Sequence, residues 1–383
     1  MHRSDVDRAD RNISDGCKGH NDLNGNKEGR KGHLPNLSIL FHDAYYTTVI
    51  EKYIISMEEP VMRLGIVGNG SIVQSALQSI KDTDIEVNAL WCRNAEKGKP
   101  LADEYGIPAV YTEYDEFLCS DAFDTVYIGL INSLHYAYAK EALLAGKNVI
   151  CEKPFTLTEA EAKELHMIAM DRDVLLFEAI MSRYSANYEA LQEHLDKVGD
   201  VRIVRCYYSQ YSRRYPAYRE GNVLPAFDPK LAGGALMDIN VYCIHFVTGL
   251  FGKPQQVHYY ANKGFNGIDT SGIAVLEYED FKAVCTGAKD CSAENGAVIQ
   301  GTNGTITMAS RPGMIKNLTY TALDGTTEAL DIAEEANPMR TEFLRIRDCI
   351  DGQEFRKANA WMLQSLTVMH VLEKARKDAD LPF

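Results

Sequence analysis

Short apolar runs alternate with segments of helical periodicity between residues 63 and 171. The apolar runs lie at 63–67, 85–91, 109–111, 125–130 and 148–151. Helices are predicted between and after them, at 71–80, 95–105, 114–119, 135–145 and 158–171. Strands and helices that alternate at this spacing form right-handed βαβ units. This part of the chain therefore predicts an α/β fold with a doubly wound parallel sheet, which binds ligands at the carboxyl ends of its strands.

The pattern changes after about residue 184, where strands follow one another without intervening helices. They are predicted at 201–209, 256–262, 273–278, 282–288, 297–301, 304–308 and 317–322. Such a succession predicts a C-terminal α+β domain with a large, mostly antiparallel open sheet. Two helices, at 340–349 and 358–377, complete the predicted elements. Since an open sheet face often packs against another subunit, we expect a homodimer or homotetramer formed through this sheet.

The first sixty residues differ in composition from the rest of the chain. Asp, Asn, Gly, Lys and Arg dominate residues 1–33, which carry very few large apolar side chains. Such a segment cannot bury enough surface to offset its ordering entropy. We therefore expect residues 1–60 to be a disordered or non-native leader, with native initiation at Met57 or Met62. A regulatory or oligomerisation arm is the alternative.

Composition and charge narrow the possible function classes. The 383 residues are 45% hydrophobic and carry a formal net charge of −14, which disfavours binding to nucleic acids or to anionic membranes. No uncharged apolar run reaches the roughly 18 residues that would span a bilayer. The nine cysteines form no C-x-x-C pair. We therefore expect reduced thiols in the cytoplasm, with neither a disulfide framework nor a metal site.

A glycine-rich turn follows the first predicted strand and resembles the G-x-G-x-x-G turn of dinucleotide-binding sheets. Gly68 would make the tight turn, and Gly70 would let the backbone approach a pyrophosphate at the N-terminus of the next helix. Val73 stands where the third glycine is usual, so we expect looser packing of that helix on its strand. The motif alone is weak, because a glycine turn can join any strand to any helix. The candidate pyrophosphate-binding residues are Gly68, Asn69, Gly70, Ser71 and Ile72.

The end of the second predicted strand indicates which dinucleotide would bind. An NAD site usually carries Asp or Glu about 20 residues past the glycines, to hold the ribose hydroxyls. Arg93 lies at this position instead, and a guanidinium suits bidentate contact with a 2′-phosphate. The sequence therefore favours NADP over NAD, with an ordinary solvated arginine as the alternative interpretation.

Polar residues follow the later strands of the predicted parallel sheet. Asn132 and His135 come after strand 125–130, and Glu152 and Lys153 end strand 148–151. All four should lie at the edge where a dinucleotide binds. A lysine there can lower the effective pKa of a reacting hydroxyl and stabilise the developing oxyanion. An exposed surface lysine is the alternative.

A second candidate pair lies beyond a double glycine at residues 233–234. Asp238 and Tyr242 are four residues apart in a predicted helix, and therefore share one helix face. A carboxylate and a phenol so paired can act as an orienting group and a proton donor. The alternative is an ordinary helix with one buried aspartate and one half-buried tyrosine.

Taken together, these stretches resemble the Gfo/Idh/MocA family of oxidoreductases, and within it the branch of dihydrodiol dehydrogenases and NADP-dependent D-xylose dehydrogenases. The most specific segments are N-S-L-H (132–135), A-G-K-N-V-I-C-E-K-P-F (145–155) and L-A-G-G-A-L-M-D (231–238). The resemblance covers roughly residues 62–378. It implies an NAD(P)-binding Rossmann domain at 61–180 and a substrate-binding and oligomerisation domain at 181–383, which includes C-terminal helices at 340–378.

The resemblance also implies roles for single residues. It makes Lys153 the catalytic lysine of the family, Asp238 its motif aspartate and Tyr242 its proton donor or acceptor. It maps Arg183 onto an arginine near cofactor or substrate. His245, one turn beyond Tyr242, is expected to be structural.

The sequence departs from the family pattern at Ile131, Pro225 and Asn240, and these departures bear on the substrate more than on the reaction class. Five tyrosines lie between residues 207 and 218, with Arg213 and Arg214 among them. Tyrosines beside a polar crevice can stack on sugars and contact their hydroxyls. A strand and loop at an interface between subunits is an equally good interpretation.

We therefore expect an NADP-dependent oxidoreductase that moves hydride between nicotinamide and a secondary alcohol or carbonyl of a sugar, polyol or trans-dihydrodiol. An NAD-dependent glycosidase that uses transient oxidation is one alternative, which Arg93 disfavours. A catalytically silent NAD(P)-sensing regulator is another. Retention of Lys153, Asp238 and Tyr242 disfavours the regulator.

Overall fold

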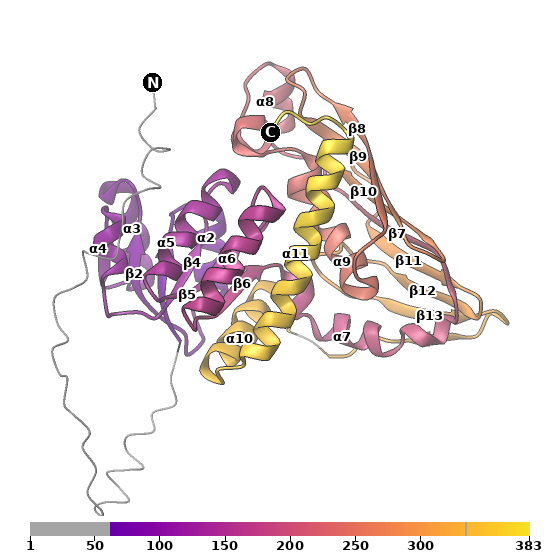
Figure 1. The fold of residues 1–383 in the computed structure, drawn as a ribbon, viewed down its shortest axis with the longest axis horizontal. Coiled ribbons are helices and arrows are strands. Elements are labelled where there is room, and N and C mark those ends of the chain that lie inside the picture. The colour runs from indigo at the N-terminus through magenta and orange to yellow at the C-terminus, as the bar shows by residue number, and fades with distance from the viewer. Residues whose placement is uncertain (1–61, 334) are drawn as a thin grey trace, which may run out of the picture.

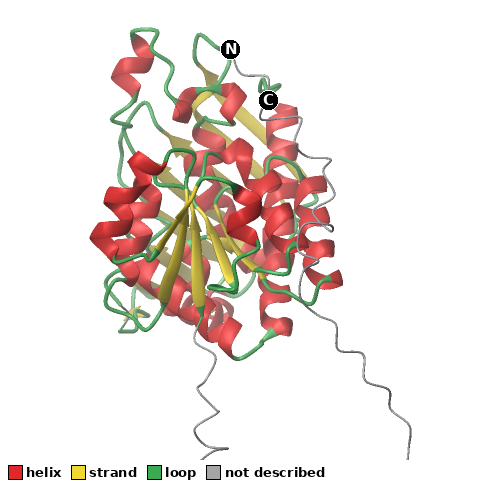
Figure 2. Ribbon diagram, turned by 90° about the vertical axis from the view of Figure 1, so that its left-hand side faces the viewer, coloured by secondary structure: helices red, strands yellow, loops and turns green. Residues whose placement is uncertain are grey.

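A computed structural model of the chain describes residues 62–333 and 335–383. Its N-terminal part is a fully parallel sheet with strand order β3-β2-β1-β4-β5-β6. Helices cover both faces of this sheet (Figure 2). The predicted α/β fold is therefore confirmed, whereas the expected leader at 1–60 lies outside the described residues. The elements of this part are β1 (Arg63–Val67), α2 (Ser71–Ile80), β2 (Glu86–Trp91), α3 (Ala95–Tyr105), β3 (Ala109–Tyr111), α4 (Tyr114–Leu118), β4 (Thr125–Ile128), α5 (His135–Leu144), β5 (Asn148–Glu152), α6 (Glu159–Asp171) and β6 (Leu176–Ala179).

The middle strands of this sheet are apolar because helices cover both of their faces. Every residue of β4 is buried, and Ile66 on β1 and Ile150 on β5 are fully excluded from solvent. Continuous burial of this kind is typical of parallel strands. The strands therefore present only their carboxyl ends to a ligand.

The C-terminal part contains a second, larger sheet with strand order β14-β13-β12-β11-β7-β10-β9-β8. All neighbours run antiparallel except β7 and β10, which are parallel. This agrees with the predicted mostly antiparallel sheet; the short strand β14 has no counterpart among the predicted elements. The strands are β7 (Val201–Ser209), β8 (Gln256–Lys263), β9 (Asp269–Glu277), β10 (Lys282–Ala288), β11 (Gly296–Gly301), β12 (Gly304–Met308), β13 (Leu318–Ala322) and β14 (Thr327–Ala329).

Helices cover one face of the larger sheet. Helix α9 packs against β7, β10 and α11, and α11 packs against β8. Val204 and Cys206 on β7 are fully buried on this side, whereas Ile203, which precedes Val204, is 47% exposed on the other. Figure 1 shows α11 running between the two sheets. The helices of this part are α7 (Ala186–Glu193), α8 (Tyr215–Arg219), α9 (Val241–Phe251), α10 (Pro338–Asp351) and α11 (Phe355–Asp378).

The two C-terminal helices also pack against the parallel sheet. Phe343 on α10 is fully buried, and its ring centroid lies 5.2 Å from that of Tyr127 on β4. Trp361 on α11 lies 6.2 Å from Phe177 on β6, measured between ring centroids. The end of the chain therefore returns to the N-terminal part and fixes the two sheets relative to each other.

One helical stretch, Pro229–Phe251, is long and apolar enough to cross a membrane by length and composition. Within the structure, 72% of its most apolar window is buried. Packing of α9 against the larger sheet and α11 accounts for this apolar character.

Candidate functional site

The glycine turn after β1 has the backbone geometry that an anion site requires. Gly68 has a φ of +108°, and a Cβ there would lie only 2.6 Å from the carbonyl oxygen of Gly129. A Cβ on Gly70 would meet open space. Helix α2 begins at this turn without a side-chain cap, so its first N–H groups have no side-chain acceptor. An anionic group can bind there, which fits the pyrophosphate of a dinucleotide.

Val73 corrects the expectation of loose packing between α2 and its strand. Its side chain is fully buried. A Cβ on Gly129, just beyond β4, would lie 2.6 Å from Cγ2 of Val73. The third glycine of the motif is therefore replaced by a valine on the helix and a glycine on the neighbouring strand, which preserves the close packing.

Arg93 lies beside this turn. Trp91, the last residue of β2, pairs with Val67, and its carbonyl oxygen accepts a hydrogen bond of 2.9 Å from the N–H of Gly68. Arg93 follows two residues later and is exposed. Its position in the chain is therefore close to the pyrophosphate-binding residues, where a 2′-phosphate would need a cation.

Lys153 emerges at the carboxyl end of β5. Its Nζ donates to Asp238 at 2.9 Å (Oδ1) and 3.0 Å (carbonyl oxygen). It also lies 5.1 Å from the ring centroid of Tyr242. The Lys153–Pro154 peptide is cis. The following helix, α6, is fixed by a capping box between Thr158 and Glu161, so the chain on both sides of Lys153 is held in place.

A π-helical turn, Leu236–Asn240, precedes α9 and carries Asp238 toward Lys153. Tyr242 lies in the first turn of α9. The ring of Tyr208 packs edge-on against it at 5.8 Å between centroids. Within residues 62–333 and 335–383, no protein group hydrogen-bonds to the Tyr242 hydroxyl, which leaves it available to a substrate. The structure thus brings Lys153, Asp238 and Tyr242 together, 85 and 89 residues apart in the chain.

Asp238 has a second cationic partner, Lys289, which the sequence analysis missed. Lys289 directly follows β10 and is only 2% exposed. Its Nζ lies 2.8 Å from Oδ2 of Asp238 and donates to the carbonyl oxygen of Ala226 at 2.7 Å. The one available signal is a lysine at the end of an apolar strand, which by itself points to no partner.

The charges in this group shift one another's pKa values. Burial alone would raise the pKa of Asp238, but Lys153 and Lys289 hold it well below its ordinary value. Burial would lower the pKa of Lys153, but Asp238 and then Tyr242 raise it above its usual range. Burial raises the pKa of Tyr242, and the charge of Lys153 opposes this rise. At neutral pH, Asp238 is therefore a carboxylate and Lys153 an ammonium, beside a protonated phenol on Tyr242.

His135 and Glu152 lie at the expected strand ends, and both make hydrogen bonds inside the protein. Both ring nitrogens of His135 are engaged inside the protein, Nδ1 with the carbonyl oxygen of Pro154 at 2.9 Å and Nε2 with that of Leu130 at 3.1 Å. The carboxylate of Glu152 is buried and accepts from the Tyr127 hydroxyl at 2.8 Å. Both side chains therefore help to fix the loops around the site, and their contact with a cofactor stays a prediction.

Asn132 links the two parts of the molecule. Its Nδ2 donates to the carbonyl oxygen of Ala232 at 2.8 Å. This bond connects the loop after β4 with the segment that precedes Asp238. Asn132 is half-buried, so it remains a predicted contact residue at the edge of the site.

Arg183 is held by hydrogen bonds to neighbouring helices. It is 5% exposed and donates to Gln364 Oε1 at 3.2 Å and to Ser365 Oγ at 2.9 Å, both on α11. Its third partner is Nδ1 of His245, at 3.2 Å. The guanidinium thus joins a buried network with His245, whose Nε2 lies 3.1 Å from Glu178. The Arg183 guanidinium is therefore directed into this network, of which His245 is a part, and the expected contact of Arg183 with cofactor or substrate stays a prediction.

Asn240, one of the departures from the family pattern, and Tyr218, in the tyrosine-rich segment, have structural explanations. Asn240 is fully buried and donates to the carbonyl oxygen of Cys285 at 3.1 Å. A Cβ on Gly287 would lie 2.7 Å from that of Asn240, so β10 makes room for the larger side chain. Tyr218 is 3% exposed and stacks between Phe227 and Phe265, at 4.9 and 4.5 Å between centroids. This tyrosine therefore holds the segment together from inside.

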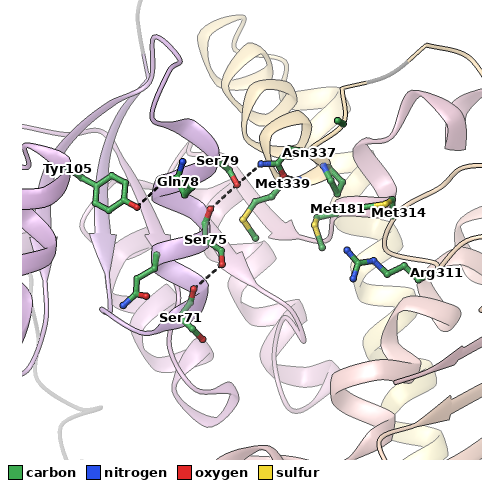
Figure 3. Close-up of a pocket in the computed structure, with 13 residues that line it drawn as sticks. Ser71, Ser75, Gln78, Ser79, Tyr105, Met181, Arg311, Met314, Asn337 and Met339 are labelled. Carbon is green, nitrogen blue, oxygen red and sulfur yellow. Dashed lines mark hydrogen bonds between the residues drawn. The ribbon is translucent and has the colours of Figure 1, made fainter. Parts of the chain in front are cut away.

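A cleft of about 720 Å³ lies between α2 and the segments that carry Arg311, Met314 and Met339. Figure 3 shows Ser71 and Ser75 of α2 on one side and Arg311 and Met314 on the other. The segment that carries these last two residues also covers the candidate tyrosine, since a Cβ on Gly313 would lie 3.1 Å from the ring of Tyr242. The cleft therefore extends from the start of α2 to the segment that covers Tyr242.

Comparison with known proteins matches both parts of the chain to one family. Residues 62–180 match an oxidoreductase family with an NAD-binding Rossmann fold, and residues 188–307 match the Gfo/Idh/MocA C-terminal domain. A scyllo-inositol 2-dehydrogenase (NADP⁺) of Bacillus subtilis is 34% identical over 84% of this chain and 98% of its own length.

A second relative and a solved structure extend this comparison. A trans-1,2-dihydrobenzene-1,2-diol dehydrogenase of Xenopus tropicalis is 31% identical over 72% of this chain and 81% of its own length. Among solved structures, a 3-ketoreductase from Actinomadura kijaniata, in complex with NADP and TDP-benzene, aligns with a TM-score of 0.72. It covers 83% of this chain and 98% of its own, at 21% identity, and so supports the fold alone.

Proposed function

This chain belongs to the Gfo/Idh/MocA family of oxidoreductases, and from that premise we propose that it is an NADP-dependent dehydrogenase or reductase. Its substrate would be a secondary alcohol, or the matching carbonyl, of a sugar, a cyclic polyol or a trans-dihydrodiol. The observation that carries the proposal is the Lys153 ammonium, held by Asp238 at 2.9 Å and lying 5.1 Å from the ring of Tyr242.

The residues around the glycine turn fit NADP. The uncapped start of α2 and the open space at Gly70 suit a pyrophosphate. Arg93, exposed beside them, would contact the 2′-phosphate. The inositol and ketone-reducing relatives are described as NADP-linked, which agrees with this assignment. When bound, the nicotinamide supplies the hydride donor or acceptor.

Proton transfer in the proposed reaction falls to Tyr242. In its ionised form, as a phenolate, Tyr242 would accept the proton of the substrate hydroxyl during oxidation, and as a phenol it would donate that proton to the carbonyl oxygen during reduction. Lys153, next to it, stabilises negative charge on the phenolate and on the substrate oxygen as each develops. Asp238 fixes the position of Lys153 and contacts no reacting atom in this scheme. Placement of an acid and base in this way contributes a rate factor of about 10²–10⁴.

Two substitutions test these roles. Lys153→Met and Tyr242→Phe should each lower turnover with NADP⁺ by about 10²–10⁴-fold. Neither should weaken NADPH binding, measured by the fluorescence of the bound dinucleotide, because neither residue lies at the glycine turn. Turnover at the unmodified rate in either variant would contradict the assignment. Loss of NADPH binding in both would mean that these residues hold the cofactor instead.

NADPH binding and substrate turnover of the unmodified protein separate the proposal from its alternatives. A silent sensor would bind NADPH in the unmodified protein without turnover of any substrate. A glycosidase of the oxidising type would release sugar without net change in the dinucleotide.

For the assembled protein, we propose a cytoplasmic homodimer or homotetramer formed through the open face of the larger sheet, where Ile203 and Ile273 are 47% and 43% exposed.

A further inference from the structure

Lys289 lies deeper in the protein than an ordinary lysine. It is 2% exposed, and its ammonium contacts one carboxylate oxygen, one carbonyl oxygen and the face of one aromatic ring. The ring belongs to Phe227, whose centroid lies 4.6 Å from the Nζ. A buried ammonium is strongly unfavourable unless it is paired and hydrogen-bonded. The surrounding groups must therefore hold it as a cation.

The carboxylate of Asp238 is divided between two cations. Oδ1 accepts from Lys153 at 2.9 Å, and Oδ2 lies 2.8 Å from Lys289. Because each oxygen has its own partner, the plane of the carboxylate is fixed, and so is the end of the Lys153 side chain. The cluster has one negative and two positive charges. Its net charge of one positive unit lies beside Tyr242.

Lys289 also ties the segment at 225–234 to the same carboxylate. Its second bond goes to the carbonyl oxygen of Ala226, at 2.7 Å. A Cβ on Gly233 would lie 2.8 Å from the carbonyl carbon of Ala226, so the segment folds tightly on itself at this point. Ala232 of the segment accepts the hydrogen bond from Asn132. One ammonium thus connects the Asp238 carboxylate with the loop that borders the site.

We propose that Lys289 is a positioning residue of the reaction: it orients Asp238, and through it Lys153, and its positive charge favours the ionised form of Tyr242 that alcohol oxidation needs. This inference rests on the proposed function. It assigns to a residue outside the matched motifs a role in setting the pH range of the reaction.

The charges around the cluster determine the sign of the expected pH effect. Tyr242 is faced by Lys153 from β5, by Asp238, by Tyr208 from β7 and by the buried Glu152. Lys289 is faced by Asp238 and by Asp269 on β9. If the charge of Lys289 is removed, the cluster becomes neutral and the phenolate of Tyr242 loses stabilisation. The pH at which oxidation becomes fast should then rise, by about one pH unit.

The first experiment compares Lys289→Met with Lys289→Arg. We would measure the pH dependence of kcat for NADP⁺ reduction with scyllo-inositol, aldopentoses and a trans-dihydrodiol as probes. In Lys289→Met, the rise of kcat should move to higher pH by about one unit, with NADPH affinity unchanged. Lys289→Arg should restore the original profile because it keeps the charge. Lys282→Met, at the exposed opposite end of β10, is the matched control and should change neither.

An unmoved profile in Lys289→Met, with kcat lowered uniformly or not at all, would overturn the proposal, because a purely structural lysine would behave in this way. If Lys289→Met does not fold, Lys289→Arg decides: its profile should be unchanged, and a shift of its pH dependence would contradict the charge argument.

A second experiment does not depend on turnover. The unfolding midpoints of Lys289→Met, Asp238→Asn and the double variant form a double-mutant cycle. We expect the double variant to lose clearly less stability than the sum of the two single losses. Additive losses would show that Lys289 does not hold Asp238. If the unmodified protein turns over no substrate while the cycle is non-additive, the proposed function fails and the contact between Lys289 and Asp238 stands.

Discussion

Asp238→Asn is the substitution that perturbs the centre of the site most selectively. It keeps the size of the side chain and removes the negative charge shared by Lys153 and Lys289, whose ammonium nitrogens lie 2.9 and 2.8 Å from its oxygens. The two ammonium groups then face each other across a neutral amide. Both the stability of the fold and the position of Lys153 should suffer.

The expected loss of stability follows from the burial of the three partners. Removing one partner of a fully buried ion pair costs about 3–5 kcal/mol. The Asp238 side chain is 36% exposed, so water screens part of the interaction, and we expect a loss of about 2 kcal/mol at pH 7. In a chain of this size, that corresponds to a drop of about 2–3 °C in Tm. Turnover should fall as well, because Lys153 is no longer fixed beneath Tyr242.

The pH dependence of this loss has a definite sign. Although burial would raise the pKa of Asp238, Lys153 and Lys289 hold it well below its ordinary value. A carboxyl whose pKa is lowered by folding adds stability above its unfolded pKa of about 3.9, and this stability is lost as the pH falls toward the folded pKa. The difference in unfolding free energy between the unmodified protein and Asp238→Asn should therefore be full at pH 7 and shrink below about pH 4.

Urea unfolding followed by circular dichroism, at a series of pH values from 7 downward, measures this difference. Glu294→Gln is a matched control, since it removes an exposed carboxylate near the end of the β10–β11 connection, which begins at Lys289. It should change the unfolding free energy by less than about 0.5 kcal/mol. A loss in Asp238→Asn no larger than in the control, or a loss that grows as the pH falls, would refute the charge-sharing arrangement.

Three further predictions follow from other parts of the structure. Arg93→Ala should narrow the preference for NADPH over NADH in fluorescence binding assays, and an unchanged preference would exclude Arg93 from the 2′-phosphate site. Gly129→Ala should cost about 1–3 kcal/mol of unfolding free energy, because the new Cβ would lie 2.6 Å from Cγ2 of Val73. The double variant Gly129→Ala, Val73→Ala should recover part of this unfolding free energy, measured by urea unfolding. Burial raises the pKa of Glu152 to about 7, against the hydrogen bond of Tyr127 and the charge of Lys153. The stability that this carboxyl contributes when protonated is lost as the pH rises from about 4.5 to about 7. The Tm of Glu152→Gln should therefore fall less than that of the unmodified protein over this pH range. An equal fall in the variant and the unmodified protein would contradict the buried placement of Glu152.

The fold could be predicted because its signals are local. Apolar runs bounded by turns gave β1, β3, β7, β10 and β12 with the observed limits, since strand burial acts on consecutive residues. The short strand β14 has no such signal. All three of its residues are exposed, and it forms only because β13 offers an edge to pair with.

The site could be predicted only in part. Lys153, Asp238 and Tyr242 carry recognisable motifs, and the structure brings them together. Lys289 has no motif, and its role depends on a pairing of β10 with β9 and β7 that no local pattern encodes. The intraprotein partners of His135 and Arg183 could not be predicted for a different reason. Their polar atoms are used by carbonyl oxygens and by α11, partners that become apparent only in three dimensions.

The absorbance of reduced nicotinamide, followed with the full chain, NADP⁺ or NAD⁺ and a panel of inositols, aldopentoses, aldohexoses and trans-dihydrodiols, tests the central claim most directly. We expect NADP⁺-dependent turnover of at least one of these alcohols, with NAD⁺ a poorer partner. Protein that binds NADPH tightly but reduces NADP⁺ with none of them would contradict the proposed dehydrogenase and favour a dinucleotide sensor of the same fold.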